Sequence, residues 1–141
     1  MQLKTTTDYA VRAVVCLAAH GAPMSSLDIA EKMGIPAKYV INIMVVLRGA
    51  DIVASIKGAE GGYYLTREPG ELTLWDVIEA MECSMSLNRC MEEDAFCSHH
   101  RVGACPTREV YLRAQRALEK CLRVPIASIL ETREDAPEGR A

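Results

Sequence analysis

The sequence predicts a mainly α-helical fold that carries one small β-hairpin. Apolar residues recur at helical spacing along much of the 141-residue chain, beginning with residues 6–20. A short alternating segment at 52–57 is followed by a glycine-rich turn and a second short strand at 63–66. A long helix is expected to begin at Pro106, because proline is favoured in the first turn. With half of its residues hydrophobic, the chain is long enough to form one domain with an appended arm.

Two short helices are expected in succession after the first one. The first of this pair covers about 26–33 and ends at Gly34, since glycine adopts the left-handed conformation of a helix C-terminus. The second begins at Pro36 and extends to about Gly49. The residues expected to pack inward are Ile35, Val40, Ile43 and either Val46 or Leu47. This pattern indicates a helix-turn-helix, although an ordinary corner between two helices has the same pattern.

The hairpin directly follows this helix pair. Its turn contains Gly58, Gly61 and Gly62, and these residues lack the Cβ that would keep a phosphate away from the backbone N–H groups. An ordinary surface hairpin is the alternative, but a hairpin at this point in the order of elements is typical of a wing. The sequence therefore predicts a winged helix-turn-helix.

Three further elements complete the fold. Thr73 is expected to cap a helix, with Asp76 completing an approximate capping box. The long helix carries an apolar stripe of small residues: Val110, Ala114, Ala117, Leu118 and Cys121. Too little chain remains after this helix to cover the stripe, so we expect it to pair with a second copy; packing on its own domain is the alternative.

The expected units are a winged helix-turn-helix DNA-binding domain at 1–82, a cysteine-bearing loop at 83–105, a dimerisation helix and a terminal helix at 106–132, and a disordered tail at 133–141.

Charge and hydropathy restrict the class of protein. The net charge is −3, but residues 1–70 carry seven Lys/Arg against six Asp/Glu, so a local basic surface on this half is compatible with DNA binding. The chain has no apolar run of about 18 residues, so we expect no contact with a membrane. No basic leader with a cleavage site is evident at the N-terminus. We therefore expect a cytoplasmic protein with reduced thiols.

Four of the six cysteines, Cys83, Cys90, Cys97 and Cys105, lie within 23 positions. Structural zinc is usually held by closely spaced cysteine pairs, which the C-x6-C-x7-C spacing lacks. An iron–sulfur cluster tolerates looped-out ligands, and a disulfide or sulfenic-acid switch is a further alternative. His99 and His100 are candidate nitrogen ligands. Cys16 and Cys121 lie in helix-like apolar segments, so we expect them to be small core residues.

Several segments resemble the IscR/NsrR-type family of dimeric winged-helix regulators, many of which carry an iron–sulfur cluster. These segments are MQLKTTTDYAVRAVVCLA, IAEKMGIPAKYVINIMVVLRGADIV, SIKGAEGGYYL, LTLWDVIEAME and ACPTREVY. The resemblance implies that Cys90, Cys97 and Cys105 hold a cluster of the 2Fe–2S or 4Fe–4S type. In NsrR-like members an Asp of the partner's first helix completes the site, and Asp8 has that position. Some relatives use a histidine, and others have no cluster.

The resemblance also implies which residues contact double-stranded DNA. The start of the second helix of the pair enters the major groove, which assigns this role to Pro36, Ala37, Lys38, Tyr39 and Asn42. Lys57 corresponds to the wing cation that enters the minor groove, beside the glycines of the turn, and Arg48 is a candidate for a phosphate contact or a supporting role. The sequence departs from the family at Glu60, which is acidic at the wing tip. It also departs at Ile41, where some members place a polar residue that reads bases, and in longer gaps between the cysteines.

We therefore expect a homodimeric transcriptional regulator, not an enzyme, that binds a pseudo-palindromic operator and senses redox state, iron, nitric oxide or cluster supply. A cluster-free regulator that senses through thiols or a protein partner is the alternative within this class. An electron carrier is the alternative from another class, but the chain lacks the closely spaced cysteines of a ferredoxin and a nucleotide-binding glycine motif.

Overall fold

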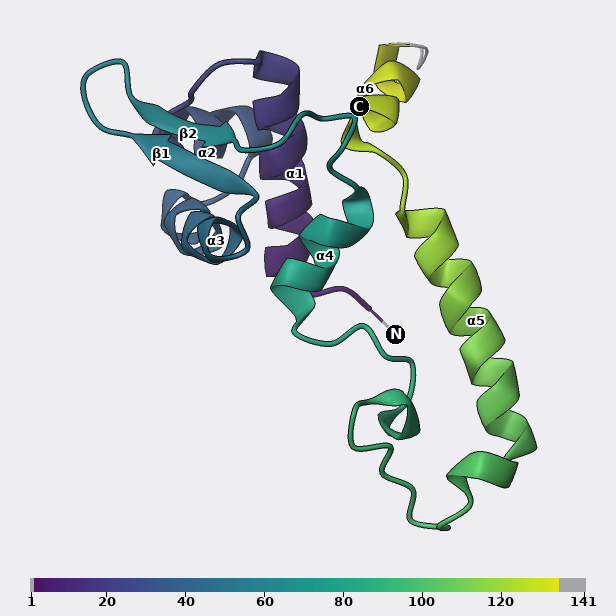
Figure 1. The fold of residues 1–141 in the computed structure, drawn as a ribbon. Helices are drawn as coiled ribbons and strands as arrows, with labels where there is room; N and C mark the ends of the chain where they lie inside the picture. Colours follow the sequence, from purple (N-terminus) through teal and green to yellow (C-terminus); the bar gives the residue numbers. More distant parts are fainter. Residues whose placement is uncertain (1, 135–141) are drawn as a thin grey trace.

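The computed structural model describes residues 2–134 and confirms the mainly α-helical fold with one hairpin. The elements are α1 (Thr5–His20), α2 (Ser26–Met33), α3 (Ala37–Gly49), β1 (Val53–Ile56), β2 (Gly62–Leu65), α4 (Leu74–Glu82), the 3-10 turns η1 (Arg89–Met91) and η2 (Val102–Ala104), α5 (Pro106–Leu122) and α6 (Ile126–Glu134). Figure 1 shows α1–α4 and the hairpin gathered on one side, with α5 running away from them. The tail expected to be disordered lies almost wholly outside the described residues. None of the helices described is long and apolar enough to span a membrane.

Local signals in the sequence determine the ends of α2 and α3. Ser25 caps α2 by accepting a hydrogen bond from the N–H of Asp28 at 3.1 Å, and Gly34 ends it in the left-handed conformation, with φ 63°. Pro36 precedes α3 in an extended conformation. The open choice between Val46 and Leu47 is settled, because Leu47 is fully buried whereas Val46 is 41% exposed.

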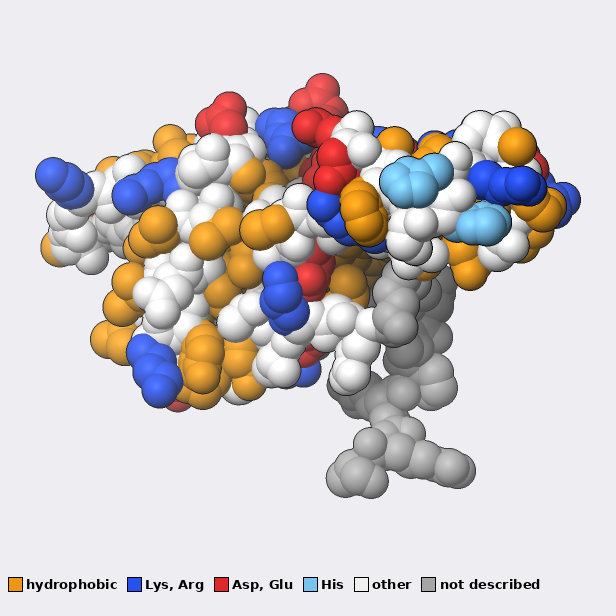
Figure 2. Space-filling view, turned by 90° about the horizontal axis from the view of Figure 1, so that it is seen from below, with side chains coloured by type: hydrophobic (Ala, Val, Ile, Leu, Met, Phe, Trp, Pro, Cys, Tyr) orange, Lys and Arg blue, Asp and Glu red, His pale blue; other side chains and the backbone are white. Residues whose placement is uncertain are grey.

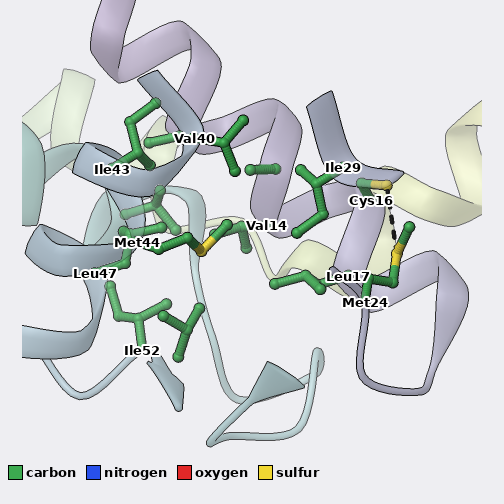
Figure 3. Close-up of a cluster of buried hydrophobic side chains, with 14 of the residues drawn as sticks. Val14, Cys16, Leu17, Met24, Ile29, Val40, Ile43, Met44, Leu47 and Ile52 are labelled. Atoms are coloured by element: carbon green, nitrogen blue, oxygen red, sulfur yellow. Dashed lines mark hydrogen bonds between the residues drawn. The ribbon is translucent and has the colours of Figure 1, made fainter. Parts of the chain in front are cut away.

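The core forms around α1, which contacts α2, α3, α4, β2 and α6. Its buried face presents Val14 and Leu17 toward Ile29 of α2 and Met44 of α3, as Figure 3 shows. These aliphatic side chains are at most 3% exposed. The helix-turn-helix is therefore held in place by the first helix and the wing.

The hairpin is joined to the chain before α2 as well as to α3. Strands β1 and β2 pair antiparallel, with Val53 opposite Leu65 and Ile56 opposite Gly62. Met24 and Tyr63 exchange two backbone hydrogen bonds, of 2.9 Å and 2.8 Å. This bridge fixes the base of the wing beside the start of α2.

The C-terminal helix α6 returns to the winged domain. Its first residue, Ile126, is fully buried in the main core, and the N–H of Ile126 donates to the carbonyl of Leu72 at 2.9 Å. Thr73 and Asp76 form the capping box of α4, with both reciprocal hydrogen bonds present. The sequence analysis grouped this helix with the expected dimerisation helix, whereas in the structure the chain returns to the winged domain after α5.

Helix α5 has no buried residue in the single chain, and Val110 is 51% exposed. The expectation that Cys121 is a core residue is wrong for the single chain, because its side chain is exposed on α5, whereas Cys16 is buried as expected. The helix lies where its spacing predicts, but within residues 2–134 nothing buries its apolar stripe.

Candidate DNA-binding face and cysteine segment

The outward face of α3 presents most of the residues expected to contact DNA. Pro36, Lys38, Asn42 and Arg48 are exposed, and Ala37 and Tyr39 are half-buried. Helix α3 contains no acidic residue. Among the described residues, no ion pair involves Lys38 or Arg48, so both cations are available to a phosphate.

An aromatic stack that the sequence analysis did not anticipate fixes the start of α3 on α1. The rings of Tyr9 and Tyr39 meet edge to face, with their centroids 5.8 Å apart. The ammonium of Lys38 lies 5.3 Å from the Tyr39 ring, and the guanidinium of Arg12 lies 5.6 Å from the Tyr9 ring. Tyr39 therefore positions α3 through its ring. The spacing of Tyr9 on the apolar face of the first helix was the only signal in the sequence for this contact.

The turn of the wing exposes Lys57, Gly58 and Glu60. At two of its glycines, the surrounding backbone leaves no room for a side chain. A Cβ on Gly61 would lie 2.2 Å from the carbonyl oxygen of Ile56, and a Cβ on Gly62 would lie 2.4 Å from the backbone of Met24. The N–H of Gly61 already donates to the carbonyl of Gly58 at 3.1 Å. Space for a phosphate is therefore not needed to explain glycine at 61 and 62.

The cysteine segment between α4 and α5 has no core of its own, because no residue from 83 to 105 is buried. Side chains of α5 tether it: Gln115 accepts from the N–H of Leu87 at 3.0 Å, and Arg108 donates to the carbonyl of Cys90 at 3.3 Å. Arg89 also forms an ion pair with Asp94 inside the segment. Because none of its residues is buried, little packing opposes a rearrangement of this segment.

The three candidate thiols, Cys90, Cys97 and Cys105, form no disulfide and are half-buried. The backbone N–H groups of Arg101, His99 and His100, in that order of effect, lower the pKa of the Cys97 thiol by hydrogen bonding to its thiolate. These residues are not gathered in the single chain: within residues 2–134, no three His, Cys, Asp or Glu side chains are close enough to hold a metal ion.

The remaining candidate ligands lie at the surface. His99 and His100 are exposed, and Figure 2 shows histidine side chains at the surface of the molecule. Asp8, in the first turn of α1, forms an ion pair with Arg12 at 2.5 Å, with its side chain 51% exposed. The donor set nevertheless suits an iron–sulfur cluster, because thiolates are its usual ligands and the segment that carries them can rearrange. Assembly then requires movement of the segment, a second copy of the chain, or both.

A helix-turn-helix with a wing and an acid-free second helix defines a protein of the winged-helix regulator class. The sequence model of the Rrf2 family, described as an iron-dependent transcriptional regulator, matches residues 3–132. The chain therefore belongs to the Rrf2 family of transcriptional regulators, which is not a family of enzymes.

Similar proteins include members of this family with different names. The chain is 35% identical over 124 residues to protein rrf2 of Nitratidesulfovibrio vulgaris, covering 86% of this chain and 81% of that protein. It is 35% identical over 92 residues to the regulator IscR of Cronobacter sakazakii, and the match covers 64% of this chain and 57% of the relative. Among solved structures, T. potens IscR matches with a TM-score of 0.76 and 28% identity, covering all of this chain and 94% of the other. CymR, the global cysteine regulator of B. subtilis, has the same TM-score at 25% identity, with 94% and 98% covered.

Proposed function

We propose that this protein is a cytoplasmic homodimer that binds a pseudo-palindromic DNA operator and responds to the state of an iron–sulfur cluster. The observation that carries the proposal is the position of three half-buried thiols in a segment without a core, tethered to the exposed helix α5. The recognition of DNA is assigned to the α3 face and to Lys57 of the wing. Two copies of the chain that pair through α5 would present two such faces to neighbouring half-sites of the operator.

In this proposal Cys90, Cys97 and Cys105 are the protein ligands of the cluster, which supplies redox and nitric oxide sensitivity when bound. Asp8 of the partner subunit is the proposed fourth ligand. Gln115 and Arg108 connect the segment to α5 by hydrogen bonds. In this proposal, bringing the thiols together therefore shifts the position of α5 and, with it, the arrangement of the two subunits. The family description and the likeness to IscR support this assignment.

A cluster-free regulator is the second candidate, and two observations favour it. Within residues 2–134 the three thiols do not form a group able to hold a metal ion, and the pKa of Cys97 is lowered, which increases its thiolate fraction and hence its reactivity toward oxidants. The likeness to CymR, named as a cysteine regulator, supports the same candidate. The family is one of transcriptional regulators, so the electron-carrier hypothesis has no support from it.

Native mass spectrometry of the full chain, prepared without oxygen, tests the proposal. We expect a dimer that carries iron and inorganic sulfide, and we expect Cys97→Ala to lose both. Cys121→Ala is the matched control, because this exposed thiol lies on α5 outside the segment, and it should retain both.

Selection of binding sites from random duplexes separates the two candidates. If the wild-type chain enriches a sequence but holds no iron or sulfide, and iron chelation leaves its DNA affinity unchanged, the cluster assignment is wrong and the thiol regulator is supported. If no sequence is enriched with or without iron, the assignment of DNA binding is itself wrong.

A further inference from the structure

The outward face of α3 carries exposed apolar side chains among its polar ones. Eight large apolar side chains are exposed in the described part of the chain, and three of them lie on this one helix: Ile41, Val45 and Val46 are 49%, 56% and 41% exposed. At 100° per residue, Val45 lies between Ile41 on one side and Lys38 and Asn42 on the other. Ile41 and Val45, one turn apart, therefore form an exposed aliphatic patch beside the polar side chains expected to contact DNA.

This patch has no structural role in the single chain. The buried face of α3 is formed by Val40, Ile43, Met44 and Leu47, which are at most 1% exposed. Ile41 and Val45 point away from that face. Truncating them should leave no cavity, so a stability requirement does not explain them.

The charge around the patch favours DNA over a protein partner. Lys38 and Arg48 lie on the same outward face, and the helix has no carboxylate. Figure 2 shows hydrophobic side chains interspersed with Lys and Arg on the side of the molecule where α3 and the hairpin lie. A cationic surface that also carries an aliphatic patch complements a polyanion that exposes apolar groups in a groove.

We infer that Ile41 and Val45 are specificity-determining residues that contact the 5-methyl groups of thymine in the major groove. The thymine methyl is the apolar group that the four bases present there, and aliphatic side chains select for it by contact. Lys38 and Asn42 flank the patch and would contact phosphates or base edges beside it. The inference rests on the proposed DNA-binding function and deepens it, because it predicts thymine in each half-site at the positions opposite these residues.

The test uses the full-length chain and the duplex enriched from random sequence. Each thymine of the half-site is replaced in turn by deoxyuridine, which removes the methyl group alone. We expect one or two positions at which affinity falls about three- to fivefold per methyl contact. Ile41→Ala or Val45→Ala should lose a similar factor on the thymine duplex and show no further loss with deoxyuridine at its own position.

Leu27→Ala is the matched control, because Leu27 is a 68% exposed aliphatic residue on α2 and lies outside the patch. Its response to deoxyuridine should equal that of the wild type. The inference is overturned if the wild type binds thymine and deoxyuridine duplexes equally, or if both α3 variants keep the full deoxyuridine effect. Either result leaves sequence-specific binding intact, whereas failure to enrich any duplex overturns the proposed function and this inference together.

Discussion

At the scale of single residues, Gly62 shows how a close backbone contact determines residue type. The bridge between Met24 and Tyr63 brings the Met24 backbone against Gly62, whose φ is 154°. Gly62→Ala would place a Cβ 2.4 Å from that backbone, so we expect a loss of about 2–3 kcal/mol in the free energy of unfolding. Urea unfolding checks this, with Gly70→Ala as control because a Cβ there meets nothing within 4 Å. Equal stability of the two variants would show that the backbone at the base of the wing can move to accommodate the added Cβ without a loss in the free energy of unfolding.

Glu82 at the end of α4 connects that helix to the start of α1. The hydroxyl of the fully buried Thr7 donates to its carboxylate at 2.5 Å, and the N–H of Lys4 donates at 3.0 Å. These hydrogen bonds, that of Thr7 first, lower the pKa of Glu82 below its ordinary 4.5, so the folded state favours the ionised form. The resulting stability is present above pH 4.5 and is lost as pH falls through the lowered pKa.

Glu82→Gln should therefore cost about 1–2 kcal/mol at pH 7, because the charge-assisted hydrogen bonds are weakened. The difference in free energy of unfolding between wild type and variant should narrow as pH falls below 4.5. Urea unfolding at a series of pH values measures it. A difference that stays constant down to pH 3 would mean that ionisation of Glu82 contributes nothing.

At the scale of elements, α5 stands out because none of its residues is buried in the described chain. Val110, Ala114, Ala117 and Cys121 recur along one exposed side at helical spacing. Ala117→Glu would place a carboxylate on that side, where two copies would hold like charges close together. We expect the variant to be monomeric at concentrations where the wild type is dimeric, with its helical content unchanged, as measured by sedimentation and circular dichroism.

Arg116→Glu provides the control for this prediction. Arg116 is also exposed on α5, but its helical position lies away from the stripe, so the dimer should persist. Dimers of equal strength in both variants would contradict a dimer interface on the Ala117 side.

Much of the secondary structure could be predicted from the sequence because its signals are local. Ser25 and Gly34 delimit α2, and the Thr73–Asp76 capping box starts α4 as expected. The Tyr9–Tyr39 stack could not be predicted, because it joins two helices whose crossing is set by the whole core. The same holds for the exposure of Cys121, which depends on what α5 packs against.

At the scale of the whole molecule, the chain forms a winged domain closed by its own C-terminal helix, with α5 and the cysteine segment outside it (Figure 1). Ile126 enters the core beside α1 after the long excursion of α5. The two ends of α5 therefore differ: the chain after one end is joined to the winged domain by the hydrogen bond from Leu74 to Val124, and the other end follows the thiol-bearing segment, which has no buried residue.

The sequence by itself determined the order of helices and hairpin, several of the inward-facing residues of the helix-turn-helix and the set of candidate thiols, because helical periodicity, caps and turn glycines act over a few residues. Only the tertiary structure decided that Gly62 contacts Met24, that Tyr39 stacks on Tyr9, that Ile126 closes the core and that the three thiols stay apart in one chain. These outcomes depend on contacts between residues far apart in sequence, which form only when the elements pack together.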